Sequence, residues 1–213
     1  VEAAIKHLRE TGAIKAEKKA DRAANEGRVA GYAGNGVAAL VEINCETDFV
    51  AKNEEFVALA NKIAEAVAKA PAGTDVNNIR LGDGLTVLET LKQRIATTGE
   101  NLKIGKIVRL EAPGTYFGLY IHNNAKLGTL AQIKGEPTEK GAVMAKDVAM
   151  HVAFTNPAGL DRCSVPADLV ESEKAIFKKQ VEAEGKPANV ADKIVEGKLN
   201  SFYKERVLLE QMF

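Results

Sequence analysis

The sequence has little cysteine and histidine, and it has no tryptophan. Its two cysteines, Cys45 and Cys163, belong to no CxxC pair and do not stand at metal-ligand spacing from any of the three histidines. We therefore do not expect a zinc site. A single disulfide between the two is left open, but such sparse use of cysteine fits a reducing cytosol better than an oxidising compartment.

The sequence also lacks long apolar runs and an excess of charge of either sign. Its apolar runs are too short to span a membrane, and no charged-then-apolar leader with a cleavage site opens it. Lysine plus arginine and aspartate plus glutamate number 29 each, which argues against a general nucleic-acid binder. We interpret the one dense basic stretch, Lys15–Arg22, as a solvated helix or linker. We expect a cytoplasmic globular protein with neither a membrane nor a nucleic acid as a direct partner.

Common catalytic and cofactor-binding motifs are missing. The chain has no P-loop, GxSxG or HExxH pattern, and the glycines of Gly31–Gly36 lack the strand-to-helix context of a dinucleotide site. We therefore expect no cofactor and no metal of its own. One enzyme alternative remains, in which Cys45 and His122 form a thiol–base pair. A cysteine directly after a buried strand is, however, more typical of an inert packed side chain.

The spacing of apolar residues predicts an α+β protein. Asn35-Gly36 is a strong hairpin signal between two strand-like segments, 28–34 and 36–44. An amphipathic helix follows, with apolar residues at helical spacing from Phe56 to Val67. Further helices are predicted at 85–97, 139–154, 166–184 and 187–205, and further strands at 102–111, 115–122 and 127–134. The last two helices are joined by a short Gly-Lys-Pro connection, which predicts an antiparallel hairpin.

A weak internal repeat runs through the chain. Leu40–Ile43 matches Leu130–Ile133 at an offset of 90, and Phe56–Ala68 matches Gly141–Ala153 at an offset of 85. Each copy has a hairpin followed by a helix, so we expect two related subdomains. The five additional residues of the first copy lie between its strand and its helix, and added residues on a shared scaffold are a common location of function.

Phe49 lies in this added interval, which we expect to be a loop. The sequence alone supports two interpretations of the residue. It is either a hydrophobic staple for the following helix, with Thr47 or Asp48 as the N-cap, or an exposed aromatic anchor that enters a pocket on a partner protein.

The interval also carries a resemblance to a known family. Val41–Val50 (VEINCETDFV), followed by AKNEEF, resembles the signature of the elongation factor Ts family. Further segments are similar to that family and follow its order along the chain: Leu8–Arg22, Gly99-Glu100-Asn101, Ala149–Ala153 and Val195-Glu196-Gly197. The resemblance implies two related α+β subdomains, each with an antiparallel sheet and helices, and a protruding antiparallel helical hairpin.

The resemblance also implies an activity and the residues that carry it. The activity is guanine-nucleotide exchange on elongation factor Tu, in its GDP-bound and nucleotide-free forms, by displacement of the magnesium ion of that GTPase. Thr47, Asp48, Phe49 and Val50 match the family loop, in which the aromatic ring is the wedge. Gly99 and His122 match positions at or near the contact surface, although Thr98 replaces an isoleucine that can precede this glycine.

We expect the following division of the chain: the end of an N-terminal helical domain with a linker (1–26), a first core subdomain (27–112), a second core subdomain (113–165), a coiled-coil arm (166–205) and a return strand or tail (206–213). The helical pattern at Val1 and the apolar end of the sequence suggest a fragment that lacks most of the N-terminal helical domain. Met212 stands where the family usually has proline. Besides the thiol enzyme, one further alternative to an exchange factor remains, a structural module whose helical hairpin drives oligomerisation.

Overall fold

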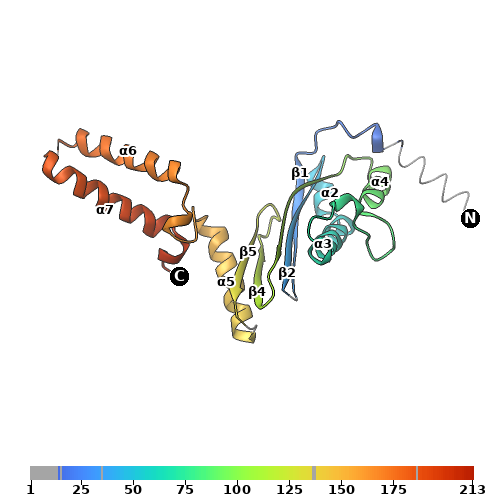
Figure 1. Ribbon diagram of the computed structural model, residues 1–213. Helices are drawn as coiled ribbons and strands as arrows, with labels where there is room; N and C mark the ends of the chain where they lie inside the picture. Colours follow the sequence, from blue (N-terminus) through green and yellow to red (C-terminus); the bar gives the residue numbers. More distant parts are fainter. Residues whose placement is uncertain (1–13, 15, 35, 136–137, 186) are drawn as a thin grey trace, which may run out of the picture. The chain divides into compact units, whose positions relative to one another are not determined.

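The computed structural model describes residues 14, 16–34, 36–135, 138–185 and 187–213. These residues fall into two compact units, one ending at Ala153 and the other beginning at Phe154 (Figure 1). The helical pattern at Val1, interpreted as the end of an N-terminal helical domain, lies outside the described residues. Of the described helices, none combines the length and apolar composition that crossing a bilayer requires.

The first unit contains a three-stranded antiparallel sheet in the order β1-β2-β3. Its strands are β1 (Glu26–Gly34), β2 (Val37–Cys45) and β3 (Lys103–Glu111). The predicted hairpin is confirmed, because β1 and β2 pair in register from Glu26↔Cys45 to Gly34↔Val37. Gly36 has a φ of +73°, a conformation that glycine adopts without strain.

Helices cover one face of this sheet. The helix α3 (Glu54–Lys69) packs on β1 and β2, and the predicted apolar stripe is its buried side: Phe56, Leu59, Ala60, Ile63, Ala64, Val67 and Ala68. The helix predicted at 85–97 is α4, which spans Val87–Thr98, and Leu88 in its first turn is 40% exposed. A capping box between Thr86 and Glu89 sets the start of α4, so its buried side carries Val87, Leu91 and Ile95 instead.

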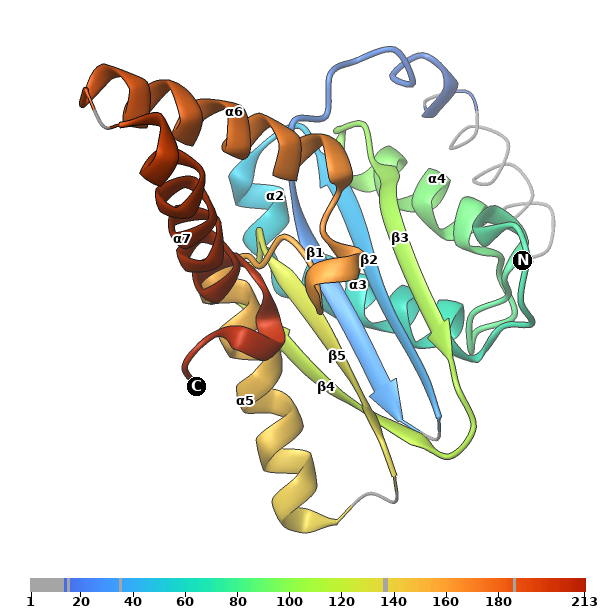
Figure 2. The same cartoon turned by 60° about the vertical axis from the view of Figure 1, so that its left-hand side comes forward.

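A two-stranded sheet packs on the opposite face of β1 and β2. It consists of β4 (Thr115–Ile121) and β5 (Gly128–Lys134). Glycines allow close approach on both faces of this two-stranded sheet. On the face toward the three-stranded sheet, a Cβ at Gly31 of β1 would lie 2.6 Å from Leu119. On the other face, a Cβ at Gly118 of β4 would lie 1.9 Å from the carbonyl oxygen of Ala145. Ala145 belongs to α5 (Glu139–Thr155). The layers of this unit are therefore helices, three strands, two strands and a helix (Figure 2).

The repeat is visible in this architecture. Leu40–Ile43 and Leu130–Ile133 lie on β2 and β5, and the matched helical segments are α3 and α5. Between β2 and α3 the first copy carries a five-residue helix, α2 (Asp48–Lys52). The added interval is therefore helical, and the prediction of a loop around Phe49 was wrong.

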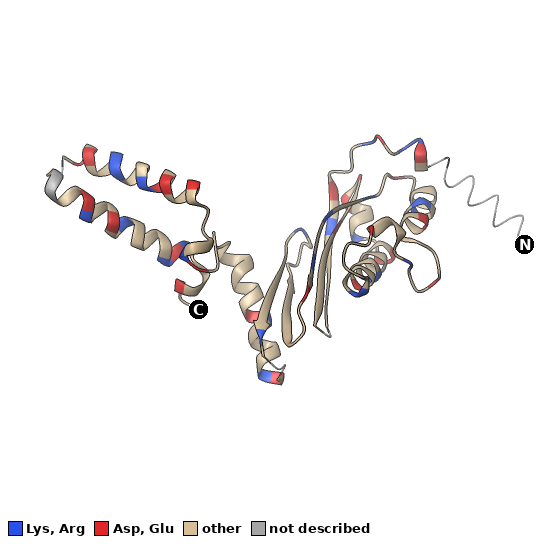
Figure 3. Cartoon of the chain, in the orientation of Figure 1, with Lys and Arg blue, Asp and Glu red and all other residues tan. Residues whose placement is uncertain are grey.

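The second unit is built on a helical hairpin. Its helices are α6 (Ala167–Ala183) and α7 (Ala188–Arg206), which follow the predicted segments closely. Lys198 donates from Nζ to Gln180 Oε1 at 2.9 Å across the hairpin. Basic and acidic residues are interspersed along both helices (Figure 3). After α7 the chain forms one parallel bridge, Gly159↔Val207, before a short 3₁₀ turn at Leu208–Glu210.

Candidate partner-binding site

The short helix α2 begins with a side-chain cap. Thr47 has extended backbone angles, and its Oγ1 accepts a hydrogen bond from the backbone N–H of Val50 at 3.4 Å. Asp48 in the first turn forms an ion pair with Lys52 at 2.7 Å, and this pairing lowers the pKa of Asp48 and raises that of Lys52. An acidic residue at a helix N-terminus is also favoured by the helix dipole. Thr47 thus caps α2, whereas the amphipathic helix α3, for which Thr47 or Asp48 was the predicted N-cap, is capped by Asn53.

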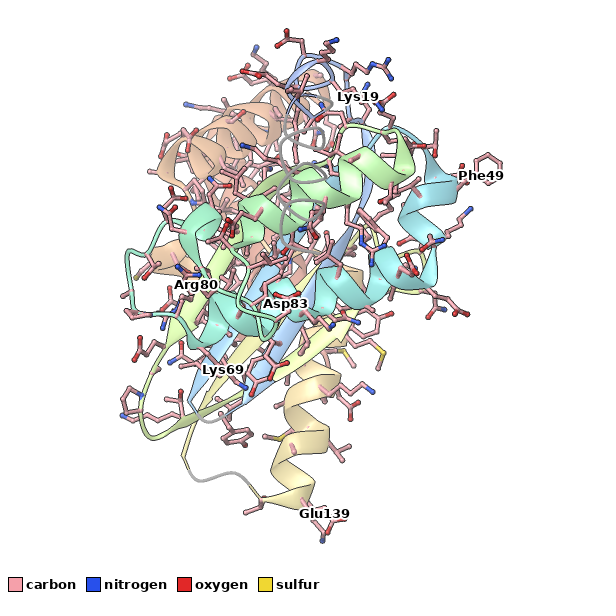
Figure 4. The ribbon with its side chains drawn as sticks, turned by 90° about the vertical axis from the view of Figure 1, so that its right-hand side faces the viewer. Lys19, Phe49, Lys69, Arg80, Asp83 and Glu139 are labelled. Carbon is pink, nitrogen blue, oxygen red and sulfur yellow. The ribbon has the colours of Figure 1, made fainter. Side chains whose placement is uncertain are left out.

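Phe49 is exposed to solvent over 82% of its surface, and its ring projects away from the body of the first unit (Figure 4). The geometry of the helix accounts for this. Ala51 is the buried residue of α2, and residues two positions apart on an α-helix point in nearly opposite directions. The interpretation of Phe49 as a hydrophobic staple was therefore wrong, because a staple would pack its ring against the fold.

A groove of about 610 Å³ lies beside Phe49. It runs between the start of α3 and the end of α4, and its lining combines apolar and polar groups: Phe49, Val50, Asn53, Glu55, Phe56, Arg94, Thr97 and Thr98. Arg94 of α4 pairs with Glu55 of α3 across it. An exposed aromatic ring can enter a pocket on a protein partner, and the adjacent groove can receive a side chain of that partner.

Glu100 connects α2 to the end of α4. Its Oε2 accepts hydrogen bonds from the backbone N–H groups of Glu46 and Thr47 at 3.1 and 3.0 Å, and its Oε1 accepts one from the Thr47 hydroxyl at 2.6 Å. In return, Glu46 Oε1 accepts from the backbone N–H of Asn101 at 2.7 Å. Glu100 is not among the contact residues predicted from the sequence. The available signal was its position in Gly99-Glu100-Asn101, directly after a predicted helix end.

Gly99 lies at the same place. It ends α4 in the left-handed conformation with a φ of +78°, and its N–H donates to Ile95 O at 3.0 Å. Its carbonyl oxygen accepts a hydrogen bond from Lys19 Nζ at 2.6 Å. Because the next residue, Glu100, holds the cap of α2, the structure brings Gly99 together with Thr47–Val50.

His122 lies in the exposed turn between β4 and β5. Its Nδ1 is 2.9 Å from the Tyr120 hydroxyl. The turn is joined to the start of β1 through the Lys126–Glu26 ion pair at 2.5 Å, and Glu26 pairs with Cys45 at the end of β2. The turn is therefore at the end of the sheet from which α2 begins. The connection is made by Lys126 and by the carbonyl oxygen of Ala125, which accepts from the backbone N–H of Val29 at 2.7 Å, whereas the His122 ring contacts Tyr120.

Cys45 is fully buried beneath α2. Its thiol donates to the carbonyl oxygen of Thr47 at 3.1 Å, and burial raises its pKa from 9.0 to about 11. A nucleophilic cysteine requires the thiolate and an accessible sulfur. The environment of Cys45 therefore favours the packed interpretation over the thiol–base pair. Within the described part of the chain, no cluster of three or more His, Cys, Asp or Glu side chains is arranged to hold a metal ion.

Comparisons with known proteins identify relatives that match this chain over its whole length. Residues 46–213 match a family model described as elongation factor Ts. A protein named elongation factor Ts from Alcanivorax borkumensis is 44% identical over 218 residues, which cover all of this chain and 74% of that protein. Proteins of the same name from Brucella ovis and Brucella canis are 41% identical over 219 residues, covering all of this chain and 72% of each.

Proposed function

The chain belongs to the elongation factor Ts family, and on this premise we propose that it is a guanine-nucleotide exchange factor for elongation factor Tu. In this proposal it acts in translation elongation, in the cytoplasm, by binding the GTPase and promoting release of GDP. It performs no covalent chemistry itself. Thr47, Asp48, Phe49, Val50, Gly99 and His122 are the proposed contact residues.

The observation that carries the proposal is the exposure of Phe49. A phenylalanine ring that is 82% exposed contributes little to folding, yet α2 and its cap hold it at a fixed place. Aromatic residues of this kind are typical anchors of protein interfaces. The five-residue helix that presents the ring lies between β2 and α3 of the first repeat, whereas only four residues, 135–138, separate β5 from α5.

Exchange requires a difference in binding free energy between two states of the GTPase. The factor must bind the nucleotide-free form more tightly than the GDP-bound form, and by reciprocity GDP then binds the complex more weakly by the same factor. A shift of about 10⁴-fold needs roughly 5.5 kcal/mol, whereas burial of one phenylalanine yields about 1.5–3 kcal/mol. Phe49 must therefore act with a wider surface, to which the groove along α3 and α4 is adjacent.

The proposed role of the ring is to displace the magnesium ion of the GTPase. That ion neutralises charge on the phosphates of the bound nucleotide, so its removal weakens nucleotide binding electrostatically. A side chain that wedges beside the ion achieves this without contacting the nucleotide. Asp48, one residue before the ring, is the polar neighbour that faces the same partner surface in this proposal.

The test is release of a fluorescent GDP analogue from elongation factor Tu, with and without this chain. We expect the chain to accelerate release, and we expect Phe49→Ala to remove about 10- to 100-fold of the acceleration, as loss of one buried phenylalanine contact implies. The free energy of unfolding should not change, since the ring is exposed in the free chain.

Phe154→Ala is the matched control, because Phe154 is 89% exposed on a different element. It should exchange nucleotide as the unaltered chain does. Equal exchange by Phe49→Ala and the unaltered chain would contradict the wedge. If the chain forms oligomers but has no effect on GDP release, the structural module built on α6 and α7 is the better account.

A further inference from the structure

We propose that Glu100 is a positioning residue for nucleotide exchange, because its carboxylate fixes α2 and with it the direction in which Phe49 projects. The inference rests on the proposed function and extends it to a residue that does not itself need to touch the partner. Glu100 follows the glycine that ends α4, and the residues that it holds precede Phe49 by two and three positions.

The carboxylate of Glu100 holds the residue that caps α2. The first N–H groups of a helix have no partner within the helix itself. Glu100 accepts from the N–H groups of Glu46 and Thr47, just before that start, and it also accepts the hydroxyl hydrogen of Thr47. Thr47 Oγ1 in turn accepts from Val50. One side chain from a distant part of the sequence thus orients the residue that caps the helix.

The helix α2 depends on such external support. Five residues are far fewer than an isolated helix needs in water, because nucleation costs more than the few internal hydrogen bonds return. Its single buried residue, Ala51, has a small side chain. Hydrogen bonds to a charged acceptor are roughly twice as strong as neutral ones. Glu100 supplies three hydrogen bonds of this kind at the two residues that lead into α2, and Arg28 adds one to the carbonyl oxygen of Ala51 within the helix.

A loosened α2 should lower the rate of exchange more than the stability of the fold. Only molecules in which the ring projects correctly promote exchange. The rate of exchange therefore decreases in proportion to the fraction of molecules in that conformation. The core under α3 does not depend on Glu100, since it is built from the buried faces of α3, α4 and the sheet.

The test combines Glu100 and Phe49 variants in the GDP-release assay at saturating concentrations of the full chain. We expect Glu100→Ala to slow release by about tenfold, as loss of hydrogen bonds to a charged acceptor implies. In the Phe49→Ala background the same substitution should change the rate by less than about twofold, because both changes then act on one step. Equal losses in the two backgrounds would overturn the inference, since Glu100 would then act independently of the ring.

Two conservative variants separate geometry from charge. Glu100→Gln keeps the length of the side chain and one oxygen that can accept from the two N–H groups, but it loses the charge and the second acceptor oxygen, so it should slow release less than Glu100→Ala does. Glu100→Asp keeps the charge but reaches one methylene less far, and it should resemble Glu100→Ala. The reverse order would contradict a positioning role. Glu171→Ala, at an exposed position of α6, is the control and should leave the rate unchanged.

Amide hydrogen exchange of the free chain provides a readout that needs no partner. In Glu100→Ala the amides of Val50, Ala51 and Asn53, which are bonded within α2, should exchange faster, while those in the middle of α3 should not change. Unchanged protection in α2 would refute the positioning role even if the unaltered chain promotes exchange. Failure of the unaltered chain to promote GDP release would refute the proposed function alone.

Discussion

Phe49 and Cys45 lie four residues apart and have opposite environments. Cys45 ends β2 with its side chain on the α3 face, as Val41 and Ile43 do, so it is fully buried. Phe49 lies on the exposed side of α2, the helix that follows β2. The burial of Cys45 could be predicted from the alternation of the strand. The exposure of Phe49 could not, because the sequence equally allowed a staple.

The two cysteines should differ in reactivity. Cys163 is exposed and Cys45 is buried with a raised pKa, so we expect one equivalent of alkylating reagent to react with the native chain at neutral pH and a second only after unfolding. Mass spectrometry of the labelled peptides measures this directly. Rapid native labelling of Cys45 would mean that α2 opens often.

The raised pKa also predicts a pH dependence of stability. The folded state binds the Cys45 proton more tightly than the unfolded state, so its contribution is fully present below pH 9 and is lost as the pH rises toward about 11. We expect the free energy of unfolding to decrease over this window, and to decrease less in Cys45→Ala. Denaturant titrations of both proteins at several pH values measure the difference.

At the level of elements, long periodic segments were predictable and short ones were not. The helix α3 carries its apolar stripe over sixteen residues, which determines both its type and its buried face. The helix α2 has five residues, which are too few to show a helical spacing of apolar side chains. Its support by Glu100 joins residues that are 53 and 54 positions apart in sequence, and such a contact leaves no local pattern.

Close packing between elements gives a prediction for Gly118. A methyl group there would lie 1.9 Å from the carbonyl oxygen of Ala145, so Gly118→Ala must push α5 away from β4. We expect a loss of about 1–3 kcal/mol in the free energy of unfolding, typical of overpacking. Gly197→Ala is the control: nothing lies within 4 Å of the added group, and alanine is the better helix former. Equal stability of the two variants would show that the sheet–helix contact adjusts freely.

At the scale of the whole molecule, the main described cluster of buried hydrophobic residues belongs to the first unit. The members of the main buried cluster lie between Ala16 and Leu102. We therefore expect a chain ending at Ala153 to unfold cooperatively on heating, as measured by circular dichroism, because removal of the second unit leaves this cluster intact. Loss of the transition would indicate that the helical hairpin is required for folding of the sheets.

The segment that precedes the core is fastened to the two residues that flank Glu100. Asn101 donates from Nδ2 to the carbonyl oxygens of Ala20 and Arg22 at 3.1 and 2.7 Å, Lys19 binds Gly99, and Glu100 lies between them. A force that pulls on the chain before Lys19 would therefore act first on the hydrogen bonds to residues 99–101 and only then on the sheet. Tension on that segment would therefore pull on the peptide that also holds Thr47, two residues before Phe49.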